Sequence, residues 1–481
     1  MSNDTPKHGA WSIPCPSPHS LKAYRWVSLA FLCCFWAAAL AGSVSQTLFG
    51  YAGAVTPVLL AAVTLTMAVL GAVTLHDAGD WALVAVFAVL TVVSALVNHV
   101  GVMVTLSGLR DYIGLLFVMP VLRWLLTSDN AGRFRRVMDR NVAVFVAVNG
   151  ALIVVQFMVC GACDKGSGLF AVPGAGPASV AQIVLTFYLV CRRWNAGRGY
   201  YANLRANWWM AAALLPVLLN ETKVSLLMLP AVTLLLVPWG HGFWRRLAKA
   251  LPLMLLTAVL SAAVYTAAVD DTSGACLFDR QYWQLYLGTD NRDAHHIATA
   301  KGAETDPDAV SDEPWRDDLP RLVKINAMDS VLHTTRGGIL LGAGVGQTRQ
   351  TAAVSPTAFA AANHWLLKGT RPMLLVVVLQ LGIMGLAWFI TATGYQSGLT
   401  ASRRQRAAQP LMTRNVQLLF ALTVAGILFY NDSMRTILMM IILLYPVASM
   451  TLAGHRATHT PDTGNHSNHF RTHDHEEPRQ A

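Results

Sequence analysis

Residues 373–392 read MLLVVVLQLGIMGLAWFITA, a predominantly apolar run without a charged side chain. A helix of about 20 such residues is long enough to cross the hydrocarbon core of a bilayer. Comparable runs fill most of the 481 residues, of which 54% are hydrophobic and only 13% are charged, and the mean hydropathy is +0.44. This composition is typical of a polytopic membrane protein and predicts an all-α bundle.

Apolar stretches of spanning length begin at about twelve places in the chain, near Tyr24, Tyr51, Trp81, Ser107, Val142, Gly174, Asn207, Val224, Leu251, Met373, Val416 and Thr436. Arginine-rich loops alternate with loops that contain almost no Lys or Arg, and they occupy residues 133–140, 192–205, 245–249 and 403–414. By the positive-inside rule, the arginine-rich loops and both termini face the cytoplasm. The weak point of this count is the loop at 76–80, which has neither Lys nor Arg.

The same alternation predicts how the chain is divided. It predicts a cytoplasmic N-terminal segment (1–23), transmembrane helices 1–9 (24–268), a large polar loop on the outer face (269–371), transmembrane helices 10–12 (372–453) and a cytoplasmic tail (454–481). The first apolar stretch is expected to be an uncleaved signal-anchor. Most of the net charge of +10 lies in short loops, where it is a topology signal, so we expect no nucleic-acid partner.

Cysteine and histidine offer weaker signals. Cys160, Cys163 and Cys276 are predicted to face outward, where an oxidising compartment could pair two of the three. A metal site is the weaker interpretation, because the Cys-Gly-Ala-Cys motif has only one further outward cysteine to recruit. The His-rich tail could bind zinc or nickel, but a solvated, disordered tail is favoured. The sequence therefore predicts no metal site.

Cations are concentrated in the second half of the polar loop. From Pro320 the pattern becomes helical, with apolar residues at three- and four-residue spacing at Leu322, Ile325, Met328 and Leu332. This spacing leaves Arg321 and Lys324 adjacent on one face, and Arg336 follows. Two cations one turn apart can hold a diphosphate through charge-assisted hydrogen bonds. The alternative is an ordinary solvated helix face.

A glycine-rich turn and a histidine complete the loop. The glycines at 337–338 and 342–346 allow close backbone approach and sharp turning, but they lack the strand–helix context of a dinucleotide site. Asn363 and His364 come a few residues before the apolar run at Met373, which places the imidazole at the outer membrane surface. A histidine there can accept a proton from an attacking hydroxyl, with Asn363 as possible support. A structural histidine that caps the next helix is the alternative.

These elements resemble the O-antigen ligase and polysaccharide repeat-unit polymerase family. The resemblance is carried by the order of Arg321, an amphipathic helix, LLGAGVG at 340–346, NHWLL at 363–367 and LQLGIMGL at 379–386. Recognisable motifs cover residues 205–393, and the rest is similar only in topology. The resemblance implies a GT-C type membrane glycosyltransferase in the bacterial inner membrane. Such an enzyme takes a glycan from an undecaprenyl-diphosphate carrier to an acceptor sugar hydroxyl on the periplasmic side, without a metal or other cofactor.

The resemblance also implies roles for particular residues. By motif match, the arginine that holds the diphosphate corresponds to Arg321, and the histidine that acts on the acceptor corresponds to His364. A further family arginine, in a Ser-Arg-Gly turn, aligns with Asn-Glu-Thr-Lys at 220–223. Lys223 there keeps the charge but loses the planar fork of arginine. Glu221 in the same turn could fix Lys223 or assist the acceptor.

Other functions remain open from sequence. A secondary transporter or lipid-linked glycan flippase also needs about twelve helices, but it should show internal repeats and charge near the bilayer midplane, and neither is clear here. A non-catalytic scaffold leaves the series of arginine, glycines and histidine unexplained. Polymerase and ligase differ in the acceptor, which is a second lipid-linked glycan, lipid A core or a protein. The departure at 220–223 favours the polymerase or a general exopolysaccharide role.

Overall fold

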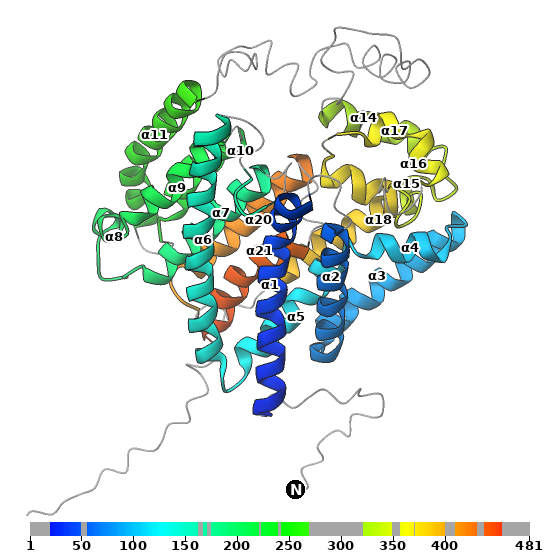
Figure 1. Ribbon diagram of the computed structural model, residues 1–481, viewed down its shortest axis with the longest axis horizontal. Helices are drawn as coiled ribbons and strands as arrows, with labels where there is room; N and C mark the ends of the chain where they lie inside the picture. The colour runs from blue at the N-terminus through cyan, green and yellow to red at the C-terminus, as the bar shows by residue number, and fades with distance from the viewer. Residues whose placement is uncertain are drawn as a thin grey trace, which may run out of the picture.

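The computed structural model describes residues 20–49, 55–161, 167–170, 175–220, 223–238, 242–268, 321–348, 356–369, 371–399, 409–430 and 437–454. Within these ranges the chain is helical and contains no strand, which confirms the all-α class (Figure 1). Cys163, Cys276, the His-rich tail and the acidic half of the polar loop lie outside the described residues.

The helices follow the apolar stretches of the sequence. Up to residue 268 they are α1 (Leu21–Phe49), α2 (Val55–Thr74), α3 (Ala78–Val97), α4 (Val102–Leu109), α5 (Ile113–Thr127), α6 (Ala131–Cys160), α7 (Ala175–Arg193), α8 (Tyr200–Ala206), α9 (Trp209–Leu219), α10 (Lys223–Leu235) and α11 (Phe243–Ala268). After residue 320 they are α14 (Arg321–Leu332), α15 (Gly338–Leu341), α16 (Ala358–Ala362), α17 (His364–Leu367), α18 (Met373–Gln396), α20 (Thr413–Tyr430), α21 (Ile437–Thr451) and the 3-10 helix η4 (Leu452–Gly454).

Six of these helices are long and apolar enough to cross a membrane, namely α1, α3, α6, α7, α11 and α18. The pair α4 and α5 is bent by 48° and makes a seventh if it is one span. The remaining apolar helices, α2, α9, α10, α20 and α21, contribute stretches of only 10–17 residues to this test. The described chain is therefore consistent with a polytopic helical membrane protein, and the count of twelve spans stays a prediction.

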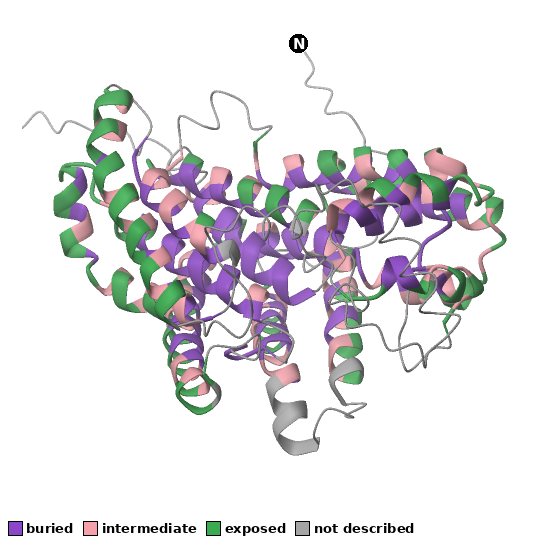
Figure 2. Ribbon diagram, turned by 90° about the horizontal axis from the view of Figure 1, so that it is seen from above, coloured by how far each residue is buried: buried purple, intermediate pink, exposed green. Residues whose placement is uncertain are grey.

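Burial separates the helices into a centre and a periphery. Every residue of α21 from Ile437 to Met450 is buried, as expected for a helix that is apolar all round. In contrast, α3 and α11 leave most of their apolar side chains exposed. Figure 2 shows this arrangement, with buried residues in the middle and exposed ones on the flanking helices. Large exposed apolar surfaces of this kind are suited to contact with lipid.

One end of the bundle, here called the arginine end, carries the turns that join α2 to α3, α5 to α6 and α7 to α8. Asp139 of α6 is its main polar link. The Asp139 carboxylate accepts hydrogen bonds from the hydroxyls of Tyr188 on α7 and Tyr445 on α21, the second at 2.7 Å. Arg192 pairs with the same carboxylate at 3.2 Å. These contacts hold three helices together where charges would otherwise be costly.

The helix α18 is broken in its middle. Gly382 has φ 66° and ψ −164°, a conformation that ordinary side chains rarely adopt. On the N-terminal side of this break, the carbonyl of Leu379 accepts a hydrogen bond from the Ala343 amide at 2.7 Å, and that of Gln380 accepts one from Gly344 at 3.0 Å. The glycine-rich segment therefore supplies backbone donors to a helix that is interrupted inside the bundle.

The same segment is held from the other side by α3 and its following turn. Asn98 accepts from the Gly337 amide at 3.0 Å and donates to the Gly342 carbonyl at 2.9 Å, while Ser94 donates to the Leu341 carbonyl at 2.7 Å. A Cβ on Gly346 would lie 2.1 Å from the Val104 carbonyl oxygen of α4. These glycines therefore lie close to neighbouring backbone, as their spacing predicted.

The break in α18 gives a stability prediction. A Cβ on Gly382 would lie 2.2 Å from the Leu340 carbonyl carbon, at a positive φ. We expect Gly382→Ala to lower the free energy of unfolding by about 2–4 kcal/mol, from the strained backbone and the forced separation of the two segments. Gly394→Ala, on the same helix with nothing within 4 Å of the added Cβ, is the matched control. Thermal unfolding in detergent measures both, and equal stability of the two variants contradicts the assigned role of Gly382.

Candidate functional site

Three short helices, α14, α16 and α17, pack onto the first half of α18, as Figure 1 shows at the end of the bundle away from the arginine end. We call this the histidine end, because it carries His364. Its apolar core is formed by Ala327, Val331 and Leu332 of α14, Ala360 of α16, Trp365, Leu366 and Leu367 of α17, and Leu375, Val378 and Leu379 of α18. Residues about 40 positions apart in the sequence are thus brought into one unit.

The buried face of α14 differs from the predicted one. Buried residues on this helix are Val323, Lys324, Ala327, Val331 and Leu332, whereas Leu322, Ile325 and Met328 are only half-buried. The buried face is therefore shifted by about one position from the predicted face. This is possible because the long apolar stem of a lysine can occupy a core position when its ammonium has a hydrogen-bond acceptor. Lys324 is 0% exposed, and its Nζ donates to the Lys368 carbonyl oxygen at 2.6 Å.

The other predicted residues of the polar loop lie nearer to the surface. Arg321, the first residue of α14, is half-buried, while Arg336 in the turn after α14 is exposed. His364 is exposed at the start of α17. Asn363 joins α16 to α17, and its side-chain amide donates to the Phe359 carbonyl at 2.9 Å. Asn363 thus fixes the backbone beside His364.

The predicted roles of Lys223 in binding the diphosphate and of Glu221 in supporting it stay predictions. Lys223 is the first residue of α10, and Glu221 lies outside the described residues. Asn220, which precedes them, is buried and donates to the Ser179 hydroxyl of α7 at 3.1 Å.

Arg371 is a further cation of this end, and sequence reasoning missed it. Its Nη1 donates to the Thr348 carbonyl at 3.2 Å. The Thr348 hydroxyl accepts from Gln380 of α18 at 2.6 Å, and Gln380 in turn accepts from the Tyr112 hydroxyl at 2.7 Å. The signal for Arg371 was an arginine immediately before an apolar run. The guanidinium is thereby attached to the glycine-rich segment.

Charge at the histidine end is one-sided within the described residues from 321 to 371. The basic residues there are Arg321, Lys324, Arg336, Lys368 and Arg371, whereas the acidic residue is Asp329. Asp329 lies 3.4 Å from His333 on the exposed side of α14. Such an excess of cations favours an anionic ligand.

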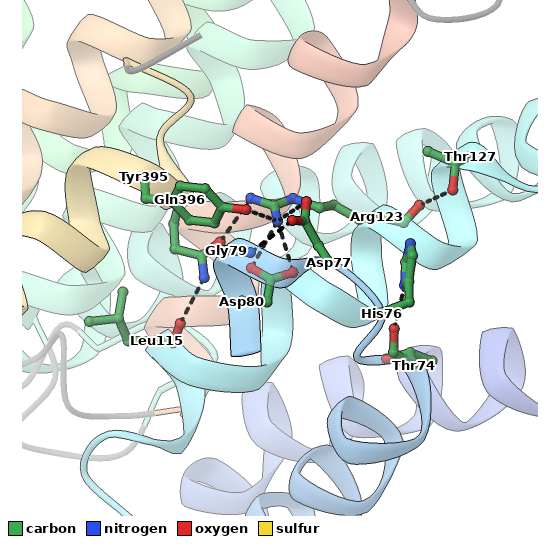
Figure 3. Close-up of polar contacts among 10 residues, drawn as sticks. All are labelled: Thr74, His76, Asp77, Gly79, Asp80, Leu115, Arg123, Thr127, Tyr395 and Gln396. Carbon is green, nitrogen blue, oxygen red and sulfur yellow. Dashed lines mark hydrogen bonds and ion pairs between the residues drawn. The ribbon is translucent and has the colours of Figure 1, made fainter. Parts of the chain in front are cut away.

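A second polar cluster, at the arginine end, was not predicted (Figure 3). Arg123 of α5 reaches both carboxylate oxygens of Asp80 at 2.8 Å and lies 3.4 Å from Asp77. Its guanidinium also lies over the Tyr395 ring of α18, 4.7 Å from the centroid. Asp80 is 1% exposed, so this pair joins α3 and α5 in a largely desolvated setting.

This cluster places a positive charge beside the loop at 76–80, whose sidedness stays a prediction. The loop has no Lys or Arg of its own, but Arg123 supplies a positive charge to it from α5. Arg123 is also the one charged residue of α5, and a single charge in an apolar helix is a signal for a paired or functional group. That signal could have found it from sequence.

No protein-family model, curated protein or solved structure matches the chain. Among the described residues, no three His, Cys, Asp or Glu side chains are placed to hold a metal ion. The two clusters therefore define the candidate chemistry. At the arginine end, Arg123 pairs with Asp80. At the histidine end, the described residues from 321 to 371 include more basic than acidic side chains and an exposed imidazole.

The Arg123–Asp80 pair gives a second stability prediction. Removing the cation in Arg123→Met leaves the Asp80 carboxylate buried without its partner, which is expected to cost about 3–5 kcal/mol of unfolding free energy. Asp77→Asn should cost much less, because Asp77 is 46% exposed and asparagine can still cap α3. Thermal unfolding of purified variants measures the difference. The double variant Arg123→Met/Asp80→Asn should recover part of the loss, and no recovery would argue against a charge effect.

Proposed function

We propose that this protein is a membrane glycosyltransferase that joins an undecaprenyl-diphosphate-linked glycan to an acceptor sugar hydroxyl. It would act as an O-antigen ligase or a polysaccharide polymerase in a bacterial inner membrane, with its site on the periplasmic face. The single observation that carries the proposal is the packing of α14 onto α17. The contact of Lys324 with the Lys368 carbonyl brings the helix that begins with Arg321 against the helix that begins with His364.

The cations suit the donor half of the reaction. As the anomeric carbon–oxygen bond breaks, the electron pair leaves with the undecaprenyl diphosphate, and negative charge grows on that group. Cations fixed beside it stabilise this charge more in the transition state than in the ground state. Arg321 is the main candidate, with Lys324, Arg336 and Lys223 as further diphosphate ligands. Lys324 would have to share its ammonium between the diphosphate and the Lys368 carbonyl.

The imidazole of His364 suits the acceptor half. The oxygen of the acceptor hydroxyl attacks the anomeric carbon from the side opposite the diphosphate, and the hydroxyl proton passes to His364. One such displacement inverts the anomeric centre. Because charge is neutralised by side chains, the proposed reaction calls for no metal or other cofactor. Asn363 supports the site by holding the turn on which the imidazole stands.

Sidedness is a testable part of this proposal. At the arginine end, Arg133 and Arg136 lie in the first turns of α6, and Arg198 lies in the turn between α7 and α8. The positive-inside rule assigns these arginines to the cytoplasm. A reporter that is active only outside the cytoplasm should therefore be active when fused near Ala303 and silent when fused near Arg136, Arg404 or His466. A silent fusion near Ala303, with protein present at normal level, contradicts both the twelve-span topology and the periplasmic site.

Substitutions at His364 and Arg321 test the chemistry directly. Loss of a positioned general base should reduce transfer by about a hundred- to ten-thousand-fold, so His364→Ala should accumulate normally and still bind the donor but fail to transfer it. Arg321→Lys should keep part of the activity and Arg321→Ala almost none, because lysine keeps the charge without bidentate geometry. The measurement is glycan transfer by purified protein, and surface glycan in a deletion strain carrying each variant.

His333→Ala is the matched control, since His333 is also an exposed histidine of the histidine end. Near wild-type transfer by His364→Ala removes the base assignment, and equal output from both Arg321 variants assigns Arg321 to the surface. Abolition of wild-type transfer by a chelator removes the metal-free mechanism. In the deletion strain, loss of long chains with single units retained indicates a polymerase, whereas loss of all attached glycan indicates a ligase.

A further inference from the structure

A groove of about 240 Å³ lies between the first turns of α1 and α6, at the arginine end. Each helix contributes one arginine and a stripe of apolar side chains to it: Arg25, Leu29 and Leu32 from α1, and Arg133, Phe134 and Val137 from α6. On α1 the three residues are four and three positions apart, and on α6 Arg133 and Phe134 lie four and three positions before Val137, so each stripe lies on one side of its helix. The groove thus has a cationic mouth and an apolar wall.

The two helices are fixed to each other beneath and beyond the groove. The Tyr24 hydroxyl donates to the Asn130 carbonyl at 3.0 Å, and Trp36 Nε1 donates to Asn141 Oδ1 at 2.7 Å. Between these two bonds, Phe31 packs edge-on against Phe134 with ring centroids 6.0 Å apart. The groove is therefore built into the helix packing and does not depend on a ligand to hold it open.

The cations of this groove differ from others at the same end. Arg123 and Arg192 are ion-paired with Asp80 and Asp139. Arg25 and Arg133 are both exposed, and neither forms an ion pair with any residue that the structure describes. Their charge remains available to an anion. Trp26, next to Arg25, is 72% exposed, as is common for a tryptophan at a membrane interface.

We infer that this groove is a binding site for an anionic glycerophospholipid. The phosphate would lie between the guanidinium groups of Arg25 and Arg133, and one acyl chain would lie along Leu29, Leu32 and Val137. In such a lipid the phosphate and the chains are joined through glycerol, which matches a cationic mouth directly beside an apolar wall. The site lies at the end opposite His364, so it is independent of the proposed glycan transfer and of its diphosphate donor.

The experiment is native mass spectrometry of the purified, delipidated full chain with phosphatidylglycerol or phosphatidylethanolamine of identical acyl chains. We expect one retained phosphatidylglycerol per chain and much weaker retention of phosphatidylethanolamine. The double variant Arg25→Gln/Arg133→Gln should bind phosphatidylglycerol about thirtyfold more weakly. The double variant Arg198→Gln/Arg205→Gln, an equal charge change at two exposed arginines outside the groove, should bind like wild type.

A second variant tests the apolar wall without changing the charge. Leu29→Trp fills the groove and should also weaken retention, while Leu65→Trp, at an exposed position of α2, should not. Soluble glycerol 3-phosphate should bind wild type much more weakly than phosphatidylglycerol does, because it lacks the acyl chain that contacts the apolar wall. Equal retention of both lipids by wild type, or unchanged phosphatidylglycerol binding in both groove variants, overturns the assignment.

Discussion

Two backbone carbonyls in the middle of α18 set the geometry of the histidine end. The positive φ of Gly382 interrupts the helix in an apolar setting, where a carbonyl without a donor costs several kcal/mol. The backbone amides of Ala343 and Gly344 donate hydrogen bonds to the carbonyls of Leu379 and Gln380. This glycine-rich segment connects α14 and α15 to α16 and α17. The hydrogen bonds that it makes to α18 therefore also determine where the residues proposed to bind the diphosphate and the acceptor sugar lie.

The position of α18 is in turn fixed at the arginine end. Tyr395 of α18 contacts Arg123 through both its ring and its hydroxyl. The guanidinium of Arg123 is also paired with Asp80 of α3. Trp388 adds a hydrogen bond to the Leu83 carbonyl of α3 at 3.0 Å. A helix tied at both its break and its end holds attached groups in one place, and small displacements of reacting groups are costly to catalysis.

The sequence predicted the helices well and their faces less well. Length and composition predict an all-helical polytopic chain because a membrane-sized apolar run has few other structures open to it, and six or seven spans of the described chain are long and apolar enough to cross a membrane. The buried face of α14 was predicted from Leu322, Ile325 and Met328, but the helix buries Lys324. Hydropathy scores lysine as polar, and it does not show that the apolar stem can be buried when the ammonium has a hydrogen-bond acceptor. Pairings such as Arg123 with Asp80 depend on tertiary contacts across 43 positions, which a single sequence does not encode visibly.

The arrangement of polar contacts bears on the choice between a transferase and a carrier. A carrier with alternating access has its substrate site near the bilayer midplane and moves one group of helices against another. Here α3 and α18 are connected at the arginine end through Arg123 and at the histidine end through the glycine-rich segment that Asn98 holds, so moving one past the other would break contacts at both ends. Contacts at both ends of α3 and α18 oppose such a sliding motion, and this supports the proposed transferase over the alternative of a carrier.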